Sequence, residues 1–280
     1  MTVVESEPDA LAPLVERTKQ GDRAAAEQLL GAVQHDLFRL ALRMLGAQPE
    51  AEDATQEILL QALTHLSEFR AESAFRTWLW RIAVRHLLRA KRTRREQLAS
   101  FETLDELMAQ GEQHPPLPAV SEAELSLMAQ EVRIVCTHGV LLSLERDQRV
   151  AWLLAEVFDL SSEEAAFVLE IDAATYRKRL SRAREKLEAW MRGRCGLADG
   201  RNACRCARQI PVATAFGVLN PARLEYAKPS GPSLRVVAEA DALESAASLL
   251  RPHPATQAPA SVLASIRTLI HSKRYVVFDA

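Results

Sequence analysis

The chain has 280 residues, which is enough for two domains of ordinary size, and its 48% hydrophobic and 26% charged residues are typical of a soluble protein. Its 35 basic and 37 acidic residues leave a net charge of −2, which taken alone argues against a nucleic-acid-binding protein. No stretch approaches the ~20 consecutive apolar residues of a membrane span, and the acidic N-terminus lacks the apolar stretch of a secretory signal. We therefore expect a cytoplasmic protein without membrane insertion.

The first third of the chain predicts helices. Across residues 10–45, apolar side chains recur at spacings of three and four, which places them on one helix face. Asp22 can cap the start of the helix that carries this stripe, and Gly46 can end it. Abundant alanine and only 10 glycines favour helix throughout the chain.

Two more helices follow, one beginning near Pro49 and one capped by Ser73. In the second of these, Trp78 lies on the apolar stripe and is expected to pack in the core. Trp80 lies off that stripe, so packing and base stacking remain equally open for it. Aromatic side chains among basic ones suit opened or single-stranded DNA, because bases can stack on them.

An acidic connector separates these helices from a second helical block. Residues 101–131 hold seven Asp or Glu and no Lys or Arg, with three prolines in the middle, which indicates a linker between domains. In the following block, Ser161 and Glu164 form a capping-box pair, and Asp172 can cap a long basic helix. Two helices joined by a tight turn, the second of them basic, are typical of a helix-turn-helix.

The charge is unevenly distributed along the chain. Residues 76–95 carry eight basic side chains and no acidic one, and residues 177–194 carry eight basic and two acidic. A solvated helix face would explain one such run. Two separated runs, one of them on a helix-turn-helix, favour phosphate contacts with nucleic acid. The near-zero total therefore results from two basic helices balanced by an acidic connector and the remaining surface.

These residues resemble those of a known family. The segments AEDATQEILLQAL (51–63) and FRAESAFRTWLWRIAVRHLLRAKRTRRE (69–96) are similar to region 2 of the extracytoplasmic-function (ECF) sigma factors of the sigma-70 family. The segment LERDQRVAWLLAEVFDLSSEEAAFVLEIDAATYRKRLSRAREKLEAWM (144–191) resembles their region 4. The resemblance covers about two thirds of the chain.

The resemblance implies an all-α protein that binds core RNA polymerase, recognises the −35 promoter element with region 4 and melts the −10 element with region 2, without a reaction of its own. In chain order, the expected parts are region 2 at 10–97, a flexible acidic linker at 98–131, the region 4 helix-turn-helix at 132–193, and a mixed C-terminal extension of unassigned role at 194–280. Core polymerase and promoter DNA are the implied partners, and an anti-sigma factor is a further possible one.

Site residues follow from the matching positions. The residues expected to contact the clamp helices of the large polymerase subunit are Asp53, Gln56 and Glu57. The residues expected to bind the −10 element are Arg70, Glu72, Ser73, Arg76, Trp80, Arg81, Arg85 and Arg89. The residues on or beside the exposed face of the recognition helix, expected to contact the −35 element, are Thr175, Arg177, Lys178, Arg179, Ser181 and Arg182. Tyr176 replaces the small aliphatic residue that the family more often has, which we expect to affect packing more than DNA contact.

The extension adds cysteines to the pattern. The candidate metal ligands are Cys136, Cys195, Cys204 and Cys206. Zinc prefers four such ligands, but the spacing is not that of a standard zinc pair. Free thiols with pKa values lowered by nearby arginines, acting as a redox switch, are the alternative. No cofactor is expected to be required. Farther along, a helix is expected over 260–273 and a short strand over 275–278.

Two other classes of function were weighed. A two-domain helix-turn-helix regulator that does not join polymerase would explain the second helical block, but not the aromatic and basic helix or the acidic face near Asp53. An enzyme with a thiol or zinc module in the extension has no support from a nucleophile–base pair, a phosphate-binding loop or a metal-ligand helix.

Overall fold

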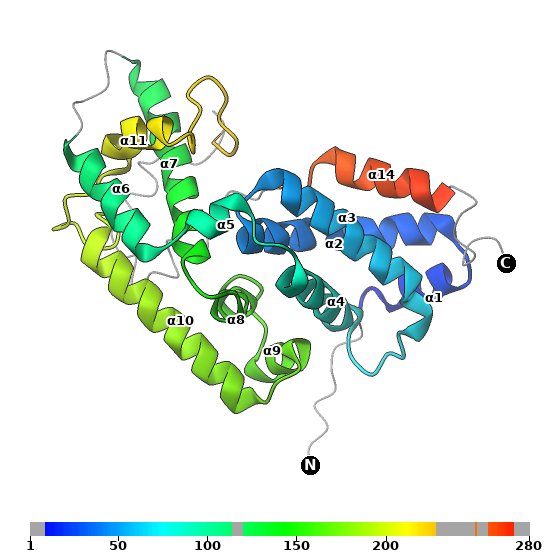
Figure 1. Cartoon of the computed structure of the whole chain (residues 1–280). Coiled ribbons are helices and arrows are strands. Elements are labelled where there is room, and N and C mark those ends of the chain that lie inside the picture. The colour runs from blue at the N-terminus through cyan, green and yellow to red at the C-terminus, as the bar shows by residue number, and fades with distance from the viewer. Residues whose placement is uncertain (1–8, 114–119, 228–249, 251–256, 272–280) are drawn as a thin grey trace.

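The computed structural model describes residues 9–113, 120–227, 250 and 257–271, and helices are the regular secondary structure of these residues, with no strand among them (Figure 1). The expected helix near the C-terminus is confirmed at Ala260–His271, whereas the strand expected over 275–278 lies outside the described residues. The first bundle consists of α1 (Ala12–Lys19), α2 (Arg23–Leu45), α3 (Gln48–Thr64), the short η1 (Leu66–Glu68) and α4 (Phe75–Arg89). The remaining helices are α5 (Arg94–Leu98), α6 (Phe101–Gln113), α7 (Glu122–Leu142), α8 (Arg146–Glu156), α9 (Ser162–Leu169), α10 (Ala173–Arg194), η2 (Cys206–Gln209), α11 (Ile210–Ala215) and α14 (Ala260–His271).

The first bundle begins and ends its helices largely as the sequence predicts. The Asp22 carboxylate caps α2 by accepting from the Ala25 N–H at 3.0 Å, and Gly46 ends it in the left-handed region at φ 73°. The predicted Ser73 cap is wrong. The N-cap of α4 is Ala74, and the Phe75 N–H donates instead to Asp9 Oδ2 at 2.6 Å, from 66 residues away.

The helices α8, α9 and α10 form a second bundle, which contains the expected helix-turn-helix in α9 and α10. Ser161 and Glu164 form the predicted capping box, and Asp172 caps α10 through the Thr175 N–H. Tyr176 is completely buried, and its hydroxyl donates to the Ala151 carbonyl at 3.1 Å. The side chain therefore joins α10 to α8, which agrees with the expectation that it affects packing.

The acidic connector is more ordered than expected. Most of its described part is helical, in α6 and the first half of α7, and not a flexible linker. The reason is that α7 has a continuous apolar face, which the acidic residue count did not reveal. α7 is long and apolar enough to span a membrane, contrary to the sequence expectation, but 67% of its most apolar window is buried inside the protein. It is a core helix of this fold.

The C-terminal extension packs back on the chain in two places. Near α7, its apolar side chains join a small second core made of Met128, Ala129, Val132, Ile210, Ala213 and Leu219. The buried Glu131 carboxylate accepts from three successive backbone N–H groups, those of Glu225, Tyr226 and Ala227, at 2.7–3.0 Å. Farther along, α14 lies against α2 and α3 on the outer side of the first bundle (Figure 1).

A buried charge network joins the two bundles. Glu96 on α5 pairs with Arg146 at 2.6 Å and with Arg149 at 3.1 Å, and all three side chains are largely or completely buried. Arg149 also donates to the carbonyls of Leu141, Leu142 and Leu144 at 2.7–2.9 Å, and to that of Met44 at the end of α2. Although burial alone would raise the pKa of Glu96, its two arginine partners hold that pKa below its usual value.

Candidate nucleic-acid interface

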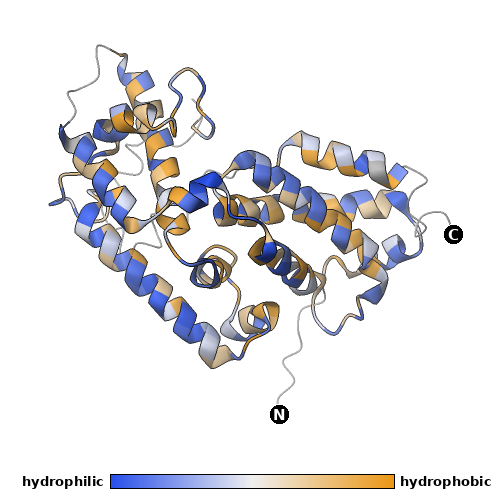
Figure 2. Cartoon of the chain, in the orientation of Figure 1, coloured by the Kyte–Doolittle hydropathy of each residue, from blue (hydrophilic) through white to orange (hydrophobic). Residues whose placement is uncertain are grey.

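The long helix α10 presents a basic face to solvent, and Figure 2 shows its surface as mostly hydrophilic. Four of the six predicted −35 residues are exposed: Arg177, Lys178, Ser181 and Arg182. The other two, Thr175 and Arg179, are half-buried, and Arg179 lies 3.5 Å from Asp147. The face is thus available to a ligand without rearrangement of the helix.

The other basic helix, α4, is partly covered by the residues around α9. Trp78 stacks with Phe69 and Phe75 at ring distances of 5.4 and 5.6 Å, which confirms its place in the core. Trp80 is only 7% exposed, and its ring centre lies 4.5 Å from that of Phe158 in the loop after α8. In this arrangement no base can stack on Trp80, whereas Trp78 is only half-buried.

One carboxylate neutralises two arginines of α4. Glu170, directly after α9, accepts hydrogen bonds from Arg81 and Arg85, the latter also through Nε at 3.0 Å. These hydrogen bonds hold the pKa of Glu170 below its usual value. The guanidinium of Arg81 also lies over the Phe167 ring at 4.8 Å. α9 and the residues beside it therefore engage Arg81 and Arg85, although Arg85 stays exposed.

The remaining predicted −10 residues are less constrained. Arg70 and Glu72 are exposed in the loop before α4, and Arg89 is exposed at its end. Ser73 is half-buried. Arg76 is exposed but pairs with Asp36 at 2.7 Å and donates to the Ala32 carbonyl at 3.2 Å. These residues thus lie around the rim of the covered surface.

The predicted polymerase-contact residues lie together on α3. Asp53 and Glu57 are exposed one turn apart, and Gln56 beside them is half-buried. Glu57 lies 3.7 Å from the ring of His86 on α4. The neighbouring Glu52 accepts from the Ser261 hydroxyl of α14 at 3.3 Å. The extension therefore borders this acidic face without covering its exposed members.

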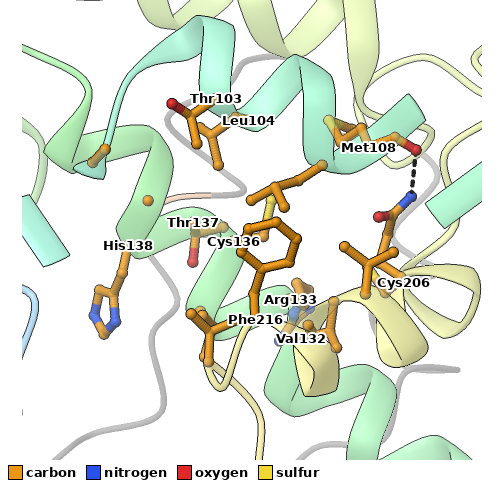
Figure 3. A pocket seen from close by; sticks show the side chains of 18 of the residues that line it. Thr103, Leu104, Met108, Val132, Arg133, Cys136, Thr137, His138, Cys206 and Phe216 are labelled. Atoms are coloured by element: carbon orange, nitrogen blue, oxygen red, sulfur yellow. Dashed lines mark hydrogen bonds between the residues drawn. The ribbon is translucent and has the colours of Figure 1, made fainter. Parts of the chain in front are cut away.

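The four cysteines line one cavity between α6, α7, the end of α10 and the extension (Figure 3). Burial raises the pKa of the Cys136 thiol well above its usual value and that of Cys206 to about 12. The expectation of thiol pKa values lowered by nearby arginines is therefore wrong for these two: burial raises both, and Arg133 lowers the pKa of Cys206 by less than burial raises it. Within the described residues, no group of three or more His, Cys, Asp or Glu side chains is arranged to hold a metal ion.

Sequence reasoning did not identify the residues that close region 4 over α4. Phe158, Phe167 and Glu170 come from the helix-turn-helix and its approach, and they meet α4 across more than 70 residues of chain. The only local signal was an acidic residue directly before the turn into a basic helix.

Comparison with known proteins identifies both helical blocks. The family model described as Sigma-70 region 2 matches residues 29–97, and the model described as Sigma-70, region 4 matches residues 134–187. A solved structure of CnrH in complex with the cytosolic domain of CnrY is similar at a TM-score of 0.46 with 21% identity, over 65% of this chain and 96% of that one.

Two curated relatives match across the same blocks. The RNA polymerase sigma-H factor of Pseudomonas aeruginosa is 33% identical over 179 residues, which are 62% of this chain and 90% of that protein. The ECF RNA polymerase sigma-E factor of Escherichia coli K12 is also 33% identical over 179 residues, 62% of this chain and 91% of that protein. With both region models in the expected order, these relatives show that the chain belongs to the ECF type of the sigma-70 family of RNA polymerase sigma factors.

Proposed function

We propose that this sigma factor divides promoter recognition between its two basic helices, with α10 of region 4 on the −35 element and α4 of region 2 on the melted −10 element. The observation that carries this proposal is the exposed basic face of α10, with Arg177, Lys178 and Arg182 beyond the first turn of a helix-turn-helix. The N-terminal part of such a helix enters the major groove, where arginine can contact guanine edges or phosphates.

The polymerase contact is proposed for the acidic face of α3. Asp53 and Glu57 are exposed there and Gln56 lies between them, on a helix whose opposite side is buried in the first bundle. A rigid helix with exposed carboxylates suits a partner surface of positive charge. In this proposal residues 10–97 form the polymerase-binding and −10 unit, and residues 132–193 form the −35 unit.

The arrangement of the free chain requires a conformational step before initiation. Trp80 cannot contact DNA while Phe158 covers it, and the guanidinium groups of Arg81 and Arg85 are engaged by Glu170. Region 4 must therefore leave α4 when the factor joins core polymerase and a promoter. A partner that holds region 4 in place, such as an anti-sigma factor, would keep the chain inactive in the cytoplasm.

Region 2 melts DNA in this proposal by binding one strand, without a reaction of its own and without a required cofactor. The rim residues Arg70, Glu72 and Arg89 are exposed and border the covered surface of α4. Extruding a base costs a few kcal/mol, which contacts to the displaced strand can offset. Positive side chains along a helix suit this task because they follow the phosphates of a single strand.

The test is transcription in vitro of genomic DNA by core polymerase with and without the chain, with start sites mapped by sequencing. We expect start sites that depend on the chain and share sequence elements near −35 and −10. The chain binding to DNA without any chain-dependent start site would contradict the proposal. That result would instead favour a regulator that does not join polymerase.

A further inference from the structure

The cavity of about 280 Å³ between α6, α7 and the extension has the composition of a binding site for a small molecule (Figure 3). Its walls are predominantly apolar, with Leu104, Met108, Val132 and Phe216 among the lining residues. At roughly 30 Å³ for each water-sized group, the volume admits a molecule of about nine or ten heavy atoms.

One buried positive charge lines this apolar space. Arg133 of α7 is only 7% exposed, and within the described part of the chain it has no hydrogen bond and no ion pair. The other lining arginine, Arg95, is different because it pairs with Glu225 at 3.4 Å and donates to the Gly46 carbonyl at 3.0 Å. No Asp or Glu is among the described residues that line the cavity.

A guanidinium that has lost most of its contact with water and has no anionic partner is costly to bury. Desolvation accordingly lowers the pKa of Arg133 from its usual value. The other ionisable groups of the wall do not balance this charge. Burial keeps His138 neutral by lowering its pKa to about 3, and the raised pKa values of Cys136 and Cys206 keep those thiols protonated.

We propose that this cavity binds a small amphipathic carboxylate, with the carboxylate on Arg133 and the apolar body against Leu104, Met108, Val132 and Phe216. A guanidinium binds a carboxylate through two parallel hydrogen bonds, and in a desolvated site this pair is stronger than at a surface. The ligand would touch α6, α7 and the extension at once, since all three contribute to the wall. The inference does not depend on which promoter elements the factor reads.

The test uses octanoate as the probe, titrated calorimetrically into the full-length chain. We expect one site per chain, with octan-1-ol and octylamine binding at least ten-fold more weakly, because they lack the negative charge. Arg133→Met should weaken octanoate binding at least ten-fold, whereas the exposed Arg208→Met on η2 should leave it unchanged. Arg133→Met should also leave the ligand-free melting temperature unchanged or raise it, since it removes an unpaired buried charge.

A second variant tests the cavity independently of the charge. Leu107→Trp places a large side chain in the wall, so octanoate binding should be lost while Arg133 is retained. The proposal is overturned by octylamine binding as tightly as octanoate, by Arg133→Met and Leu107→Trp binding like the wild type, or by Zn²⁺ occupying the cysteines while octanoate does not bind.

Discussion

The two basic helices of this sigma factor are presented in opposite ways. On α10, Lys178 and Arg182 are exposed and face solvent. On α4, Arg81 and Arg85 pair with Glu170, and the loop after α8 covers Trp80. The difference shows that two segments with a similar excess of basic residues can differ in how freely they can contact a ligand. Under the proposed function, the α10 face is ready for the −35 element in the free chain, whereas Trp80 on α4 becomes accessible to the −10 strand only when region 4 moves.

The largest effect is expected from substitutions on the exposed basic face of α10. Replacing Lys178 and Arg182 together by Glu should weaken binding to duplex promoter DNA about 100-fold, because each removed contact is worth roughly 1–3 kcal/mol. Fluorescence anisotropy with a −35 duplex measures it. The control is Arg201→Glu, an arginine that is 90% exposed on the extension. A similar loss in the control would mean that only net charge matters.

The next largest effect is expected from breaking the contact of Glu170 with α4. Glu170→Arg replaces the shared carboxylate by a like charge beside Arg81 and Arg85, so region 4 should leave α4. We expect binding to a single-stranded −10 oligonucleotide to rise about ten-fold while duplex −35 binding stays the same. Glu102→Arg, at an exposed position of α6, supplies the matched change of charge. Equal gains in both variants would show that the contact does not restrain α4.

Acid should weaken the same contact. The pKa of Glu170 is lower in the closed arrangement than its ordinary value of 4.5, because Arg85 and Arg81 donate hydrogen bonds to the carboxylate. The stabilisation is therefore complete above that value and is lost as the pH falls through the lower closed-state pKa. Energy transfer between dyes at Lys91→Cys and Glu163→Cys should decrease below about pH 4.5. Glu170→Gln should remove this part of the pH dependence, and an unchanged profile in that variant would assign it to other groups.

The smallest effect is expected at Tyr176, near the start of α10. Tyr176→Phe removes the hydrogen bond to the Ala151 carbonyl and should cost about 1 kcal/mol in the free energy of unfolding. Denaturant titration measures this change. Duplex −35 binding should remain the same, since Tyr176 is buried behind the basic face; a ten-fold loss of binding would instead place its ring in the DNA contact.

Local chemistry in the sequence predicted the helices, because their signals lie within a few residues. Asp22, Ser161 and Asp172 cap helices as expected, and the α10 stripe is buried as predicted. Tertiary contacts were beyond this reasoning. Asp9 replaces Ser73 at the start of α4, and Glu131, counted as part of an acidic linker, is a buried acceptor for the extension.

The candidate sites show the same difference between local signals and tertiary contacts. The exposure of the α10 face followed from helix periodicity, and so did that of Asp53 and Glu57 on α3. The covering of Trp80 and the unpaired charge of Arg133 did not, since each depends on segments that are distant in the chain. Composition also concealed the apolar face of α7, which lines the cavity beside Arg133.

The most direct test of the central claim is the distance between α4 and α9 in the free chain and in the polymerase complex. Dyes at Lys91→Cys and Glu163→Cys report it by energy transfer, with the unsubstituted chain showing how far its four native thiols are labelled. We predict high transfer in the free chain and a marked decrease when core polymerase and promoter DNA are added. High transfer that persists in a complex that initiates transcription would contradict the account, because α4 would then contact the −10 strand without region 4 leaving it.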